Sequence, residues 1–126
     1  MPLAGLLALL PAAAGAGEAL PVPSGQLVEL LDVVANAPGP DGLTARFRFV
    51  APAIAGAVDF DAASADMAWL CQNYALPRIA GTGPQPAQIV ISLSDRPVAF
   101  GDPDPDVIQY FEAYRPTAGQ CEPELF

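Results

Sequence analysis

Two cysteines are the residues of this sequence best suited to covalent chemistry. Cys71 lies in the helix-like stretch DMAWLCQNYALP, and Cys121 lies near the C terminus. A reactive thiol needs a base or a cation beside it to lower its pKa. Cys71 has an apolar setting, and the nearest arginine in sequence, Arg78, follows a proline. In an exported chain, two cysteines most often form a disulfide. The sequence therefore favours a structural Cys71–Cys121 disulfide over a reactive thiol or two unpaired buried thiols.

The chain contains no histidine. This absence excludes Ser-His-Asp and Cys-His catalysis, and it excludes zinc or copper sites with imidazole ligands. We expect neither a cofactor nor a metal.

Paired carboxylates are the remaining catalytic possibility. Two acids facing each other across a cleft, about 5 to 9.5 Å apart, can hydrolyse a glycoside without histidine. The sequence does not show which acids would pair, and solvated acids are the simpler interpretation. The candidates are Asp59, Asp61, Asp66, Asp95 and Glu112.

The segment GDPDPD resembles the first half of a calcium-binding loop at Asp102, Asp104 and Asp106. The sixth position of such a loop should be glycine and the twelfth a bidentate glutamate. Val107 and Ala113 occupy those positions. The segment is therefore interpreted as a solvated acidic loop, with Asp104 beginning a helical turn.

The polar turn SDRP follows the most apolar predicted strand, and loops after such strands often present binding residues. Asp95 and Arg96 are therefore the candidate binding residues, although a plain turn remains the alternative.

The charge of the chain excludes nucleic acid as a partner. Fourteen acids face five arginines, for a formal charge of −9. Nucleic acid and anionic lipid repel such a domain. The arginines of Arg46-Phe47-Arg48-Phe49 are expected on the solvent side of a strand, paired with nearby acids.

The N-terminal stretch MPLAGLLALLPAAAGAGEA is typical of an export signal. A short apolar run precedes small residues that fit cleavage near residue 16 or 19. The run is shorter than the roughly 20 residues that span a bilayer. We expect a signal peptide over residues 1–19, one domain over 20–126, a periplasmic or secreted location, and no stable membrane insertion after cleavage.

The remaining pattern predicts an α+β fold in which one main helix packs on a small, mostly antiparallel sheet with a C-terminal hairpin. Met67, Leu70, Cys71 and Tyr74 form the apolar stripe of the helix, which Asp61 or Ser64 caps and which Pro77 ends or kinks near Leu76. Strands are expected at 26–35, 43–50, 87–93, 98–100, 110–115 and 120–126.

The first two strands are expected to form a hairpin with a long loop at NAPGPDG. A trial register that pairs Ala35 with Leu43 places Asp32 opposite Arg46 on the outer side.

Three stretches carry a resemblance to a known family: SADMAWLCQNYALPRI, PAQIVISLSDRPVAFG, and FEAYR with the later cysteine. They resemble a family of small exported proteins of marine-type alphaproteobacteria, described as a domain of unknown function. The resemblance covers nearly all of the mature chain and implies no activity. Some members are labelled acetolactate synthase, but a thiamine-diphosphate enzyme needs several domains, for which this chain has no room.

These observations favour a non-catalytic exported module that binds a protein or an envelope component. The alternative is a small hydrolase that works with carboxylates.

Overall fold

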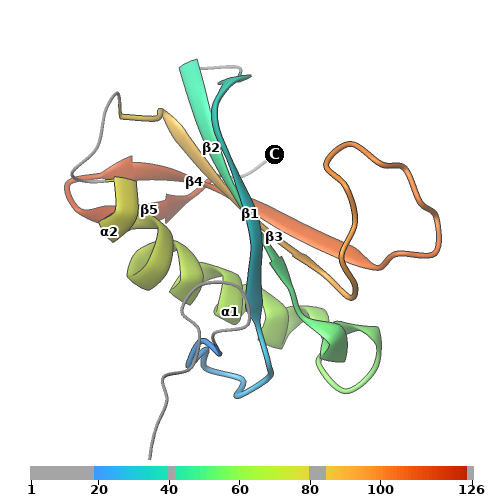
Figure 1. Cartoon of the computed structure of the whole chain (residues 1–126). Helices are drawn as coiled ribbons and strands as arrows, with labels where there is room; N and C mark the ends of the chain where they lie inside the picture. Colours follow the sequence, from blue (N-terminus) through green and yellow to red (C-terminus); the bar gives the residue numbers. More distant parts are fainter. Residues whose placement is uncertain (1–18, 40–41, 80–84, 125–126) are drawn as a thin grey trace, which may run out of the picture.

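In the described part of the chain, the computed structural model shows a five-stranded sheet with a helical segment against one of its faces (Figure 1). The structure describes residues 19–39, 42–79 and 85–124. Apart from Ala19, the predicted signal segment lies outside the described residues. Within these ranges, no helix has both the length and the apolar character needed to cross a bilayer.

The strands follow one another across the sheet in chain order. Only β2 and β3 run parallel, and the other neighbouring pairs of described strands are antiparallel. A parallel pair needs a long crossover connection, which the helical residues supply. The predicted α+β fold is confirmed. The strands are β1 Glu29–Gly39, β2 Gly42–Val50, β3 Gln88–Ser94, β4 Gln109–Thr117 and β5 Gln120–Pro123; the helical elements are η1 Pro52–Ala55, α1 Phe60–Leu70, η2 Cys71–Ala75 and α2 Leu76–Ile79.

The sheet has a helix face and an outer face. The predicted helix stripe packs on the helix face through Met67, Leu70 and Cys71, all fully buried. Tyr74 joins them with edge-to-face contacts to two β2 rings. Period-two alternation places the β2 phenylalanines on this face and the β2 arginines on the outer face. β3 is buried on both faces, as expected for a central strand. The sheet residues of the core are Ala45, Phe47, Phe49, Ile89, Ile91, Leu93 and Tyr114.

The trial register of the first hairpin is wrong. Leu43 pairs with Pro38, and Asp32 pairs with Arg48. The register shifts between Leu30 and Asp32, and again between Val34 and Ala37. Such irregularities insert unpaired residues, which a strict alternation cannot anticipate.

β1 also extends through the predicted loop as far as Gly39. A β-carbon at Gly39 would collide with the Thr44 hydroxyl oxygen, so glycine permits this close approach of the two strands.

The helix begins earlier than predicted. Asp59, and neither Asp61 nor Ser64, is the N-cap, and its carboxylate accepts from the Ala62 amide at 2.9 Å. Asp59 has the extended backbone that a capping residue needs, whereas Asp61 is already helical. Ser64 instead donates to Glu112 on β4 at 3.0 Å.

Pro77 does not end the helical segment at Leu76. The helix widens into the π-type turn η2, in which the Leu76 amide donates to the Cys71 carbonyl, and then continues through α2 to Ile79. A proline has no N–H to complete the normal pattern, and a widened turn is one way for a helix to accommodate this.

One further prediction is wrong, because residues 98–100 do not form a strand. A turn does begin at Asp104, whose carbonyl accepts from the Val107 amide at 3.4 Å. Residues 95–108 form one long connection, the β3–β4 loop, in which the Asp104 carboxylate accepts from the Asp106 amide at 2.9 Å. Proline at 97, 103 and 105 gives this loop few amide donors for a sheet. Within the described residues, the last strand covers only Gln120–Pro123 of the predicted 120–126.

Candidate functional site

The β3–β4 loop, drawn in orange in Figure 1, is closed at its base by a reciprocal pair of contacts. The Asp95 amide donates to the Ile108 carbonyl at 3.0 Å, and the Ile108 amide donates to the Asp95 carboxylate at 3.1 Å. Arg96 forms an ion pair with Asp95 at 3.0 Å and also donates to the Asp106 carbonyl at 3.2 Å. The two candidate binding residues therefore hold each other and the base of the loop. A binding role for them stays a prediction.

The Asp95 carboxylate should make the stability of the fold depend on pH. The hydrogen bond from Arg96 is the largest cause that lowers the pKa of Asp95 from its ordinary value. A lowered pKa in the folded state stabilises the fold above the ordinary carboxyl pKa, and this contribution is lost as pH falls through the folded value.

We expect Asp95→Asn to lower the free energy of unfolding at neutral pH and to have a smaller effect in acid. Urea unfolding of both proteins across the acid range measures the difference. Arg96→Gln, which removes the largest cause of the shift, is the matched variant and should reduce this pH dependence. Equal differences between wild type and Asp95→Asn at every pH would contradict the assignment.

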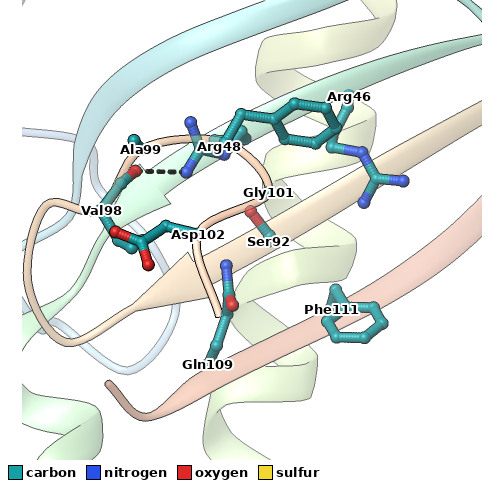
Figure 2. A pocket seen from close by; sticks show the side chains of 10 residues that line it. Arg46, Arg48, Ser92, Val98, Ala99, Gly101, Asp102, Gln109 and Phe111 are labelled. Carbon is teal, nitrogen blue, oxygen red and sulfur yellow. Dashed lines mark hydrogen bonds between the residues drawn. The ribbon is translucent and has the colours of Figure 1, made fainter. Parts of the chain in front are cut away.

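A cavity of about 370 Å³ lies between the outer face of the sheet and the β3–β4 loop (Figure 2). β2, β3 and β4 supply its floor, and the loop supplies one wall. Asp95 and Arg96 do not line it. The lining residues are Arg46, Arg48, Ser92, Val98, Ala99, Phe100, Gly101, Asp102, Gln109 and Phe111.

Arg48 holds the loop over the sheet. Its side chain is only 3% exposed. One guanidinium nitrogen donates to the Asp32 carboxylate at 2.7 Å, and another donates to the Val98 carbonyl of the loop, the bond drawn in Figure 2. The charge of Arg48 is therefore compensated by Asp32, and its role is to position the loop.

Arg46 lies two residues earlier on the same face, yet within the described residues it makes no ion pair and no side-chain hydrogen bond. The side chain is half-buried. Its guanidinium lies 5.5 Å from the centre of the Phe100 ring, as does that of Arg48. Burial, and then the neighbouring Arg48 charge, lower the pKa of Arg46 from its ordinary value. The cavity thus contains a half-buried cation that makes no ion pair within the described residues.

Two neutral donors line the cavity beside Arg46. Ser92 pairs with Arg48 on one side and with Phe111 on the other, so its hydroxyl points to the outer face. In the part of the chain that the structure describes, neither this hydroxyl nor the Gln109 amide forms a side-chain hydrogen bond. Figure 2 shows both around the same opening as the Arg46 guanidinium and the Phe111 ring. The arrangement can receive a group that carries negative charge and accepts several hydrogen bonds.

The predicted acids do not converge on this cavity. Asp59 caps α1, and Asp66 is buried beneath the N-terminal segment, residues 20–28. Glu112 accepts from Ser64 on the helix face. Asp102 is the one carboxylate among the lining residues. Among the described residues, no three acids or cysteines are grouped so as to hold a metal ion.

Sequence reasoning placed two residues of this site, Arg46 and Arg48, on the correct face of the sheet, but it did not identify them as binding residues. It placed both β2 arginines on the outer face with acid partners, which holds for Arg48 and fails for Arg46. It did not identify Ser92, Gln109 or Phe111. A serine within the apolar strand AQIVISL was the available signal, because a buried polar side chain there requires a partner.

On the helix face, the structure brings Cys71 and Cys121 together as a disulfide, with their α-carbons 6.2 Å apart. Gln72 adds two contacts between the helical segment and the last hairpin. Its side chain accepts from the Cys121 amide at 3.0 Å and donates to the Gly119 carbonyl at 2.9 Å. The sulfur atoms are thus part of the scaffold and lie on the face opposite the cavity.

Comparison with known proteins bears on the family and not on the activity. A family model described as "Family of unknown function (DUF6497)" matches residues 6–126. No curated protein matches the chain, and no solved structure matches it. Since the family model covers nearly the whole sequence, as the resemblance predicted, the chain belongs to this family of unknown function.

Proposed function

We propose that the chain is a non-catalytic binding module and that its binding surface is the outer face of the sheet, at the cavity under the β3–β4 loop. The observation that carries the proposal is the half-buried Arg46 guanidinium, which has no countercharge among the described residues. Most polar groups taken out of water in a protein have a partner. A cation that lines an open cavity without one is available to a ligand.

Exposed apolar side chains at the same cavity support this proposal. Phe111 is 59% exposed and Phe100 is 56% exposed, and both line the cavity. Ile108, at the base of the loop, is 38% exposed. Aromatic side chains around a few polar groups are the usual composition of a ligand site.

The hydrolase alternative has less support from this site. A pair of catalytic carboxylates must face each other across the substrate. Asp102 is the one carboxylate that lines the cavity. Asp59 caps α1, Asp95 closes the base of the β3–β4 loop, and Asp66 is a buried hydrogen-bond acceptor.

We further propose that the module works outside the cytoplasm, in the periplasm or as a secreted protein, where it binds a protein or an envelope component. The disulfide supports this location because such bonds persist in oxidising compartments. With a formal charge of −9, the chain disfavours nucleic acid as the partner.

Fragment screening by NMR tests the proposed binding surface. We expect the amide shifts that small fragments induce to cluster on β2, β3, β4 and the β3–β4 loop. Phe111→Ala should abolish most of them, whereas Phe60→Ala, which removes another exposed ring from the N terminus of α1, should not. Shifts that gather on the helix face, or that survive Phe111→Ala, would refute this binding surface.

A further inference from the structure

We infer that the cavity binds a small organic monocarboxylate with an aromatic or apolar body. This inference rests on the proposed function and names the chemistry of the ligand. It depends on three features of the lining, namely one uncompensated guanidinium, two free neutral donors, and two aromatic side chains.

The first feature sets the charge of the ligand. Asp32 compensates Arg48, so among the described lining residues Arg46 is the cation that is free to pair. A guanidinium presents its N–H groups in a planar fork that fits a carboxylate with two parallel hydrogen bonds. A ligand with a second charge, such as phosphate, would bring that charge close to Asp102 within the same small cavity. One negative charge is therefore the best match.

The second feature sets the number of acceptors. A carboxylate has roughly four lone-pair positions, of which a bidentate arginine uses two. The Ser92 hydroxyl and the Gln109 amide line the same opening as Arg46 and can donate to the others (Figure 2). An isolated surface arginine has no such supporting donors. These three side chains together can therefore bind one carboxylate.

The third feature sets the body of the ligand. Phe100 and Phe111 line the cavity and are more than half exposed to solvent, and burying such rings against an apolar group is favourable. The cavity volume, about 370 Å³, falls near the lower end of the usual range for ligand pockets. A compact acid fits this volume better than an extended chain does.

Isothermal titration with four probes tests the inference on the full mature chain. Phenylacetate carries both the charge and the ring, phenylacetamide lacks the charge, acetate lacks the ring, and inorganic phosphate adds a second charge. We expect phenylacetate to bind at least about tenfold more tightly than each of the other three. Phenylacetamide loses the hydrogen bonds to a charged group, which contribute roughly that factor or more. Acetate and phosphate lose the burial of the ring.

Two variants assign the effect to Arg46. Arg46→Gln should weaken phenylacetate binding at least about tenfold. Arg46→Lys keeps the charge and loses the planar pair of N–H donors, so its affinity should lie between those of the wild type and Arg46→Gln. Arg78→Gln makes the same change of net charge on α2, on the helical side of the molecule, and should leave binding unchanged. Thermal unfolding should confirm that Arg46→Gln folds, because within the described part of the chain this side chain has no ion pair or hydrogen bond to lose.

A further titration distinguishes a free small acid from the C-terminal carboxylate of a peptide. N-acetyl-glycyl-phenylalanine also carries a phenyl ring and a carboxylate, but at the C terminus of a peptide. If the protein binds phenylacetate tenfold more tightly than it binds this peptide, the ligand is a free acid. The reverse order of affinities would refute a free acid and favour a peptide C terminus.

The outcomes separate the inference from the proposed function. If phenylacetamide binds as tightly as phenylacetate and Arg46→Gln has no effect, the carboxylate is refuted while the binding surface stands. If none of these probes perturbs the outer face, and the fragment screen gives no cluster there, both proposals fall.

Discussion

Replacing both cysteines with alanine should lower the free energy of unfolding by about 4 kcal/mol. Cys71 and Cys121 are 50 residues apart in sequence, and the chain-entropy model assigns roughly that value to a loop of this length. A domain of this size is usually stable by about 5 to 15 kcal/mol, so the bond supplies a large share of the total. Its removal should also loosen β5, a four-residue edge strand with only one neighbour in the sheet.

Urea unfolding of the wild type and of the double variant, each with and without reducing agent, measures this effect. The reduced wild type should unfold at nearly the same urea concentration as the double variant, and reducing agent should not change the variant. Alanine is the suitable replacement because Cys71 is fully buried, so that serine would bury a hydroxyl. An unchanged unfolding midpoint in the oxidised double variant would show that the bond does not stabilise the fold.

Asp66→Ala should cost about 3 kcal/mol of stability. Asp66 is fully buried on α1. Its carboxylate accepts from the Ser24 amide at 2.9 Å, from the Ser24 hydroxyl at 2.5 Å and from the Gln26 side-chain amide at 2.7 Å. Hydrogen bonds to a charged group contribute roughly 1.5 to 3 kcal/mol, and buried donors left without a partner add to the loss. The alanine variant removes the acceptor of all three donors at once.

The loss of Asp66 should be felt most in the N-terminal segment. This segment packs on the core through Val22 and Val28, both nearly or fully buried, and Asp66 is the contact that ties it to the helix. We expect limited proteolysis of Asp66→Ala to cut between residues 20 and 28 well before the body of the domain. Ser24→Ala, which removes one of the three donors and leaves Asp66 in place, should cost about 1 kcal/mol. A Ser24→Ala variant less stable than Asp66→Ala would contradict this account.

Local patterns in the sequence predicted the elements of the fold. The alternation of LTARFRFV gave a strand, the apolar run AQIVISL gave a buried central strand, and the stripe through Met67 and Leu70 gave the helix that covers them. Each of these patterns reflects one element in contact with one core, so it can be recognised without knowing which element lies beside it.

The predictions that failed depend on neighbours. The register of the first hairpin shifts because β1 contains two irregularities, and the strand persists to Gly39 because β2 lies close enough to pair with it. The helix continues past Pro77 because a widened turn precedes it. These outcomes depend on backbone geometry that residue preferences describe only weakly.

The candidate site shows most clearly the difference between what a local pattern predicts and what tertiary contacts decide. Arg46 and Arg48 are equivalent in the sequence pattern, since both alternate to the outer face of one strand. Only the tertiary structure brings Asp32 and the Val98 carbonyl to Arg48 and leaves Arg46 facing the cavity.

By itself, the sequence determined the fold class, the pair of cysteines and the absence of imidazole chemistry, because composition and short-range periodicity carry that information. The tertiary structure decided which of two like charges is compensated and where the β3–β4 loop lies. These features arise from contacts between residues that are distant along the chain, and no local pattern encodes them.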